Sequence, residues 1–287
     1  MLEIVTFRSL VALPITILFF RLEGGKGLPT TSQPKLQVVR GIFLFLSYTT
    51  FMMGLAALPL ADIESIRFSG PMMITILSVF MLGEKVELRR WLALIVGFAG
   101  ILLIVKPGST NFNVGSLFVL ISVLFYALTV ILTRKMNATD SSATMAYFSS
   151  WVYLIAAFIT SPIAAAVGEI PNAHPSIAFL FHVWTMPTAF DLFIMSGLGL
   201  VWAGWAYFMT RAYSVAQASV IAPFEYASLP IGVMWGFLFW REIPAGTTIA
   251  GAVLTLLSGL YILVQEQKQK ESPSQIIIDN PPLESEA

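Results

Sequence analysis

The sequence contains no cysteine and very little charge. Among its 287 residues there are two histidines, and Asp, Glu, Lys and Arg together make up 11%. The absence of cysteine excludes a disulfide framework, a thiolate metal site and a thiol nucleophile. Soluble domains are about 25% charged, so these few charges could not cover a globular surface with polar groups. The net charge of zero also argues against a nucleic-acid partner, which would need a basic surface.

Long apolar segments take the place of the missing charge. Hydrophobic residues make up 57% of the chain, and the mean hydropathy is +0.81. A helix needs about 20 mainly apolar residues to cross the hydrocarbon core of a bilayer. Nine segments have this character: Ile4–Phe20, Leu36–Leu55, Ile63–Leu82, Trp91–Val105, Val114–Thr133, Thr144–Val167, Leu192–Tyr207, Val215–Trp240 and Thr247–Val264. They are too long and too continuous for barrel strands. The sequence therefore predicts an all-α polytopic membrane protein with nine transmembrane helices in the lipid bilayer.

Basic residues are divided unequally between the two sides of the predicted helices. Twelve Lys and Arg side chains fall on one side and two, Lys106 and Arg241, on the other, while Arg8 and Arg67 fall inside spans. Cytoplasmic loops carry an excess of Lys and Arg. We therefore expect a multi-pass protein of the cell (inner) membrane with its C-terminus in the cytoplasm. Residues 266–287 are rich in charge and proline, which predicts a disordered cytoplasmic tail.

Two stretches of the chain resemble each other. Residues 58–84 and 214–242 each lead into an apolar helix that ends at a glutamate, and a span rich in small residues follows. The two loops after these helices fall on opposite sides of the membrane. The copies would therefore have inverted topology, which is an architecture of secondary transporters. This predicts a first repeat of four spans at residues 1–105 and a second repeat of five at 106–265. A chance likeness between two hydrophobic helices is the alternative.

Short motifs occur in an ordered series along most of the chain. They are Phe7-Arg8-Ser9-Leu10, Leu82-Gly83-Glu84, Gly97-Phe98-Ala99-Gly100, Arg211-Ala212-Tyr213, Ala222-Pro223-Phe224-Glu225-Tyr226 and Glu242-Ile243-Pro244. With these motifs the chain resembles the drug/metabolite transporter superfamily, EamA type. The resemblance implies ten spans in two inverted five-helix halves, so the chain looks as if it lacks the first helix, through a late start or a real loss. It also implies secondary transport of a small amphipathic or zwitterionic metabolite, such as an amino acid, S-adenosylmethionine or riboflavin.

Arg8, Arg67 and Glu225 fall inside predicted spans, where a charge costs about 2.5–3.5 kcal/mol on insertion scales. Aligning the two repeats with an offset of 158 residues places Arg67 opposite Glu225. We hypothesise that both face a shared central cavity and bind opposite charges of a zwitterionic solute. The alternative is a structural ion pair between Glu64 and Arg67. Arg8, the third residue, would either bind a substrate carboxylate bidentately or extend to the membrane interface.

Aromatic residues and prolines complete the candidate binding site. The aromatic side chains inside spans that could stack on a planar or cationic solute are Tyr126, Tyr147, Trp202, Trp205 and Tyr226. Packing against lipid is the alternative for each of them. Pro71 and Pro223 interrupt spans and free backbone carbonyls, as in the broken helices that line transporter sites. A simple kink is the alternative for both prolines.

The sequence contains no recognisable catalytic or cofactor site. His174 and His182 lack neighbouring metal ligands, and there is no glycine-rich phosphate-binding loop with a lysine. We therefore expect no enzyme activity, no cofactor and no metal. Two alternatives to transport remain: a non-transporting membrane subunit or receptor, and an intramembrane enzyme, which would need a Ser–His or two-Asp constellation at depth. The expected partners are a small-molecule metabolite and the bilayer, with a homodimer left open.

Overall fold

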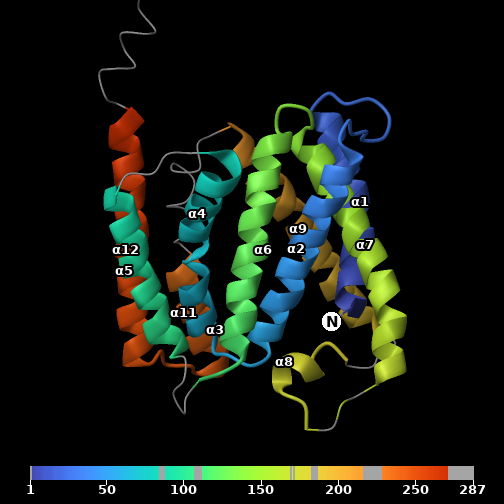
Figure 1. Cartoon of the computed structure of the whole chain (residues 1–287). Helices are drawn as coiled ribbons and strands as arrows, with labels where there is room; N and C mark the ends of the chain where they lie inside the picture. The colour runs from blue at the N-terminus through green and yellow to red at the C-terminus, as the bar shows by residue number, and fades with distance from the viewer. Residues whose placement is uncertain are drawn as a thin grey trace, which may run out of the picture.

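The computed structural model describes residues 2–83, 88–106, 112–168, 170, 172–181, 187–215 and 228–270. Its elements are helices, and none of these residues forms a strand. In chain order they are α1(Leu2–Leu22), α2(Pro34–Leu55), α3(Leu60–Arg67), α4(Gly70–Leu82), α5(Leu88–Val105), α6(Gly115–Met136), α7(Ser142–Val167), α8(Pro175–Ala178), α9(Ala189–Val215), α11(Ser228–Trp240) and α12(Gly246–Lys270) (Figure 1).

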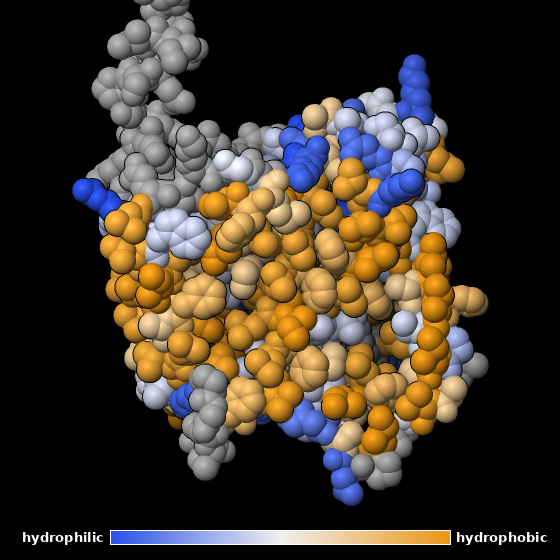
Figure 2. All heavy atoms as spheres, viewed as in Figure 1, coloured by the Kyte–Doolittle hydropathy of each residue, from blue (hydrophilic) through white to orange (hydrophobic). Residues whose placement is uncertain are grey.

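The helices have the length and composition of membrane spans. Among the described residues, six segments are long and apolar enough to cross a bilayer: Leu2–Leu22, Pro34–Leu55, Leu60–Met81, Gly115–Met136, Ser142–Val167 and Ala189–Ser214. Shorter apolar helical segments occupy the other three predicted spans: Trp91–Val105, Ile231–Trp240 and Gly246–Tyr261. Figure 2 shows hydrophobic side chains over a broad band of one face, with hydrophilic side chains gathered towards its ends. The prediction of an all-helical polytopic membrane protein is confirmed.

The predicted start of the C-terminal tail differs from the structure. The predicted tail, residues 266–287, begins too early, because α12 continues to Lys270. A charged, polar sequence can extend a helix beyond the apolar span when the helix is already nucleated. The eighth predicted span, Val215–Trp240, is described only from Ser228 onwards, as α11. Residues 216–227 lie outside the described part of the chain.

The connections between helices divide between two ends of the bundle (Figure 1). One end carries the α1–α2 and α6–α7 turns. We call it the basic end because five basic residues lie in or beside those turns: Arg21, Lys26, Lys35, Arg134 and Lys135. The α2–α3 connection, residues 56–59, lies at the opposite end.

Carboxylates tie distant parts of the chain together at both ends. At the basic end, Oδ2 of Asp140 accepts hydrogen bonds from Oγ1 of Thr31 over 2.6 Å and from Nε2 of Gln37 over 2.7 Å. At the opposite end, Oε2 of Glu242 accepts from the N–H of Leu60 over 2.9 Å. Because this N–H lies in the first turn of α3, it has no partner within its own helix. The carboxylate therefore also places a negative charge at a helix N-terminus, where it is favourable.

The third predicted span is divided into two helices. α3 and α4 are separated by a turn at residues 68–69. Pro71 has no N–H, so the carbonyl of Arg67 has no donor four residues further on. The backbone N–H of Ser69 instead donates to the carbonyl of Ile66 over 3.0 Å, and the Ser69 hydroxyl donates to the same oxygen over 2.7 Å. The turn therefore interrupts the helix inside the membrane without leaving the Ser69 side chain unpaired.

Two apolar clusters lie on either side of the centre of the bundle. One joins α1, α2, α7 and α9 and includes Tyr153, which is 1% exposed. The other joins α3, α4, α5 and α6 and includes Ile63, Met72 and Ile101, all buried. Burial of such side chains holds neighbouring helices together through close van der Waals contact, since lipid is as apolar as the core.

α5 and α12 pack against each other along small residues (Figure 1). A methyl group added at Gly100 would lie 2.7 Å from the carbonyl oxygen of Gly251, and one added at Gly251 would lie 2.5 Å from that of Gly100. The hydroxyl of Thr255 donates to the carbonyl of Gly97 over 3.3 Å. The two backbones therefore touch directly, which only small residues allow. We call this contact the α5–α12 seam.

Gly100→Ala should destabilise the protein, because the added methyl group would push α12 away from α5. Overpacking of this kind costs about 1–3 kcal/mol. The thermal unfolding temperature of the purified protein in detergent measures the effect. Gly197→Ala is the matched control, since nothing lies within 4 Å of a methyl group added there. Equal unfolding temperatures for the two variants would contradict a close-packed seam.

Candidate functional site

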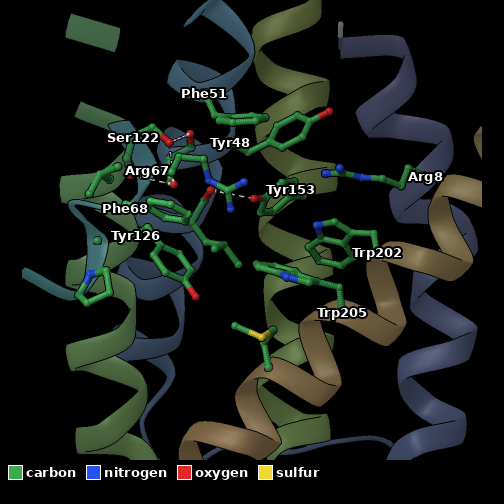
Figure 3. Close-up of a pocket in the computed structure, with 16 residues that line it drawn as sticks. Arg8, Tyr48, Phe51, Arg67, Phe68, Ser122, Tyr126, Tyr153, Trp202 and Trp205 are labelled. Carbon is green, nitrogen blue, oxygen red and sulfur yellow. Dashed lines mark hydrogen bonds between the residues drawn. The ribbon is translucent and has the colours of Figure 1, made fainter. Parts of the chain in front are cut away.

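A cavity of about 440 Å³ lies in the middle of the bundle. Its wall is built from α1, α2, the α3–α4 region, α6, α7 and α9, so both halves of the sequence contribute. Six residues that the sequence analysis selected line it: Arg8, Arg67, Pro71, Tyr126, Trp202 and Trp205 (Figure 3). The wall combines aromatic rings with two guanidinium groups, which is the composition of a small-molecule site rather than of a lipid-facing surface.

Arg8 is enclosed by three aromatic rings. Its guanidinium carbon lies 4.3 Å from the ring centroid of Tyr48, 5.0 Å from that of Trp202 and 5.3 Å from that of Tyr153. A desolvated cation–π contact is worth about 2 kcal/mol, so the rings offset part of the cost of burying the charge. Arg8 is only 5% exposed and points into the bundle (Figure 3). The expectation that Arg8 would extend to the membrane interface is therefore wrong.

Close contact between α1 and α9 makes this arrangement possible. A methyl group added at Gly199 of α9 would lie 2.8 Å from the carbonyl oxygen of Arg8 and 2.8 Å from Cβ of Val11. Trp202 follows Gly199 by three residues, so it lies on nearly the same face of α9. Gly199 has no side chain, so α9 can approach α1 closely at this level. The indole of Trp202 can then cover the guanidinium of Arg8.

Arg67 forms an ion pair within α3. Its Nη1 donates to Oε1 of Glu64 over 2.9 Å, and its guanidinium carbon lies 5.2 Å from the ring centroid of Phe51. The structural ion pair expected as the alternative for Arg67 is therefore present. The Arg67 side chain is nevertheless 44% exposed and lines the cavity, whereas Glu64 packs against Gly232 of α11.

The structure does not bring every predicted residue to the cavity. Tyr147 lies elsewhere on α7, with its ring 5.6 Å from that of Phe148, and is not among the described residues of the wall. It precedes the wall residue Tyr153 by six residues, about 240° around the helix, so the two rings point in different directions. Three further predicted residues lie outside the described part of the chain, and their place in the site stays a prediction: Glu225, Tyr226 and Pro223.

The wall also contains polar residues that the sequence alone did not single out. The hydroxyl of Tyr153 donates to the carbonyl of Leu44 over 2.7 Å. Ser47 and Ser122 each donate from the hydroxyl to the other's carbonyl, over 2.9 and 2.7 Å, and so join α2 to α6. The only sign of these residues in the sequence was a polar group inside an apolar segment. Many other serines and threonines share that pattern and simply bond to a carbonyl of their own helix.

Arg40 is a second buried arginine, 3% exposed, on the basic-end side of the cavity. It precedes the wall residue Ser47 on α2 by seven residues, which is about 10 Å along the helix axis. Its guanidinium donates to four neutral groups on α6, α7 and α9: Oγ1 of Thr133 (2.7 Å), Oγ of Ser149 (2.8 Å), the carbonyl of Met145 (3.2 Å) and Oγ1 of Thr210 (3.3 Å). Arg40 is one of the twelve Lys and Arg residues that were predicted to lie on the cytoplasmic side. The structure places it inside, where these groups replace its hydration. We call Arg40 and its four partners the Arg40 cluster.

Thr133→Val should destabilise the protein more than Thr210→Val. Both threonines are buried, but the 2.7 Å bond from Nε of Arg40 to Thr133 is shorter than the 3.3 Å bond to Thr210. Leaving a buried donor without its partner costs about 1–3 kcal/mol, more when the donor is charged. Unfolding temperatures of the two variants in the same detergent test this order. An equal or larger effect of Thr210→Val would show that the cluster is not held as described.

Known proteins resemble this chain over most of its length. The S-adenosylmethionine uptake transporter of Rickettsia prowazekii is 27% identical over 266 residues, which cover 93% of this chain and 82% of that protein. The riboflavin transporter of Rhizobium johnstonii is 27% identical and covers 85% of this chain and 75% of its own length. The pseudopaline exporter of Pseudomonas aeruginosa is 28% identical, with 89% and 84% covered.

A solved crystal structure, described only as that of a protein, shares the fold. It superposes with a TM-score of 0.60 and covers 91% of this chain and 88% of its own, at 15% sequence identity. Residues 1–106, which contain Arg8 and Arg67, match the model of the EamA-like transporter family. This match and the three relatives show that the chain is similar to the EamA-like transporters.

Proposed function

We propose that this protein is a secondary transporter that carries a small amphipathic or zwitterionic metabolite across the membrane by alternating access. The central cavity is the observation that carries the proposal. Its volume of about 440 Å³ falls within the roughly 300–1,000 Å³ of small-molecule sites. Two arginines line it, and ionisable residues inside a membrane bundle mark solute pathways. The relatives named above are transporters of small metabolites, which supports transport over a receptor or an intramembrane enzyme.

The α5–α12 seam supports an inverted repeat of residues 1–105 and 106–265. With the offset of 158 residues, Gly97 is equivalent to Thr255, and these two residues contact each other. The same offset makes Gly100 equivalent to Ser258 and Ala93 equivalent to Gly251. Gly100 contacts Gly251, and the hydroxyl of Ser258 donates to the carbonyl of Ala93. A two-fold axis that passes between Gly97 and Thr255 would exchange the Gly100–Gly251 contact with the Ser258–Ala93 contact.

Contacts elsewhere in the bundle follow the same relation. In an inverted repeat, α1 corresponds to α7, α2 to α9 and α5 to α12. α1 packs against α7, and α5 packs against α12. Exchanging the two repeats turns each of these helix pairs into itself. The contact of α1 with α9 maps onto that of α7 with α2, and both are present. Two halves related in this way can exchange conformations and so open a midplane site to each side in turn.

We assign the basic end to the cytoplasm of a cell (inner) membrane protein, because cytoplasmic loops carry the excess of Lys and Arg. The Arg40 cluster then lies between the cavity and the cytoplasm. A small pocket of about 30 Å³ next to Arg40 shares Leu44, Tyr126, Trp205 and Met209 with the cavity wall. The cluster joins α2 to three helices of the second half by bonds to neutral groups. Such bonds exchange readily for water, so the cluster is suited to closing the cytoplasmic side and to reopening.

Liposomes that contain the purified protein and unlabelled S-adenosylmethionine should take up labelled S-adenosylmethionine from outside by counterflow. Exchange through a carrier needs no ion gradient, so the assay detects transport without knowledge of the coupling ion or direction. Riboflavin, tested in parallel, samples a second solute of the relatives. Protein-containing liposomes without internal solute are the control. If folded protein exchanged neither these solutes nor amino acids, the transport proposal would be wrong.

Arg40→Gln should expose the small pocket to the cytoplasmic side. The chain has no cysteine, so Ala206→Cys introduces a single thiol into that pocket without background labelling. We expect a thiol reagent added at the basic end to label this thiol several-fold faster when Arg40 is replaced. Ala127→Cys, a fully buried core position, should stay protected in both backgrounds. Thr133→Val removes one hydrogen bond of the Arg40 cluster and so should raise the labelling rate less than Arg40→Gln does. If neither substitution changed the labelling rate, the cluster would not act as a gate.

A further inference from the structure

We propose that Arg8 is the receptor for an acid group of the solute, so that the protein selects small carboxylic acids with a planar or aromatic part. This inference rests on the proposed transport function and adds the chemical class of the solute. It is based on the hydrogen bonds of Arg8. A buried guanidinium in the cavity wall has one edge without any hydrogen-bond partner among the described residues.

The unpartnered atoms of Arg8 are Nε and Nη2. The N–H bonds of these two atoms point in parallel from the same edge of the guanidinium plane. This edge fits the two oxygens of a carboxylate, which then accept two parallel hydrogen bonds. Buried polar atoms are mostly paired in folded proteins, so this unpaired, charged edge in the cavity wall is available to a ligand. A carboxylate supplies both the acceptors and the charge.

The three aromatic rings determine what can approach Arg8. Tyr48, Tyr153 and Trp202 cover the guanidinium within 4.3–5.3 Å, so a cation already occupies this aromatic cage. A cationic group of a solute would meet a like charge there, and Trp202 is not free to stack on it as the sequence analysis hypothesised. Tyr48 is the nearest ring, is only partly buried and lines the cavity. Because Nε and Nη2 are buried, side chains around Arg8 must move for an acid group to reach them.

The charges around the cavity favour an anion as well. Among its described wall residues there is no Asp or Glu. Arg67 shares its charge with Glu64, and Arg40 near the cytoplasmic end has only neutral partners. Arg8 therefore remains without a neutralising carboxylate among the described residues. In a low-dielectric interior, such a charge attracts an anion much more strongly than it would in water.

The rest of the wall suits the planar part of the solute. Phe51, Phe68, Tyr126 and Trp205 also line the cavity (Figure 3). Trp205 is 40% exposed, so its indole presents a free face. Aromatic rings bind flat groups by offset stacking or edge-to-face contact. An acid group on Arg8 and a ring between these side chains would together fix the orientation of the solute.

Paired probes that differ only in the acid group test this assignment. We would measure binding of S-adenosylmethionine and decarboxylated S-adenosylmethionine, and of tryptophan and tryptamine, to the purified full chain by isothermal titration. The acid-bearing member of at least one pair should bind at least tenfold more tightly. Arg8→Gln should remove this preference. Arg8→Lys keeps the charge but lacks the two-donor edge, so it should recover only part of the preference.

Arg241→Gln is the matched control. Arg241 also lies over an aromatic ring, that of Phe237 at 5.6 Å, but it is exposed and outside the cavity wall. The preference for the acid should survive this substitution. Equal affinities for both members of each pair in the unmodified protein would overturn the inference without any variant. Retention of the preference in Arg8→Gln would overturn it too. Acid-dependent binding without counterflow would instead refute transport and leave the acid site standing.

Discussion

A polar group inside this bundle depends on partners within the protein or its ligand, because the surrounding hydrocarbon offers none. This constraint explains which helices meet. The Arg40 guanidinium draws hydroxyl and carbonyl groups of α6, α7 and α9 around α2. Ser47 and Ser122 join α2 to α6, and Tyr153 joins α7 to α2. Apolar packing fills the spaces between helices, but these polar bonds specify the neighbours and their depth.

The two buried arginines satisfy the constraint in different ways. Arg40 has four hydrogen bonds to the protein, so its charge is stabilised without any further ligand. Arg8 has three rings over its guanidinium but an unpaired edge. The first arrangement is complete and holds helices together. The second is incomplete and so has affinity left for another molecule. A buried arginine can thus hold helices together at one depth in the membrane and bind a solute at another.

The sequence was sufficient for the fold class and for much of the cavity. Apolar length predicted the helices, and Pro71 indicated the position of the interruption near residues 68–69. Arg8, Arg67 and Trp202 were found because charge and large aromatic rings are unusual at membrane depth. Tyr147 was misplaced because an apolar helix with little amphipathic pattern gives no sign of which face is turned inwards. Arg40 was taken for a surface charge, since its neutral partners come from three distant segments.

The sequence could not show which of the many hydroxyl groups cross between helices. Ser47 and Ser122 look the same in sequence as Thr50 or Thr160, whose hydroxyls bond to carbonyls of their own helices. Only the close approach of α2 and α6 distinguishes them. Likewise, nothing in the sequence revealed that three rings from α2, α7 and α9 would converge on one guanidinium of α1.

The α5–α12 seam has a mechanical consequence. Its closest contacts join backbone atoms, small residues and two hydroxyls. Because the two backbones touch directly there, a rotation of one helix against the other by a few degrees about this point would move the atoms at the seam least. The same rotation would displace helices on the far side of the cavity by a larger distance. The seam is suited to act as a fulcrum, so that the molecule can change shape at its centre while one edge stays nearly still.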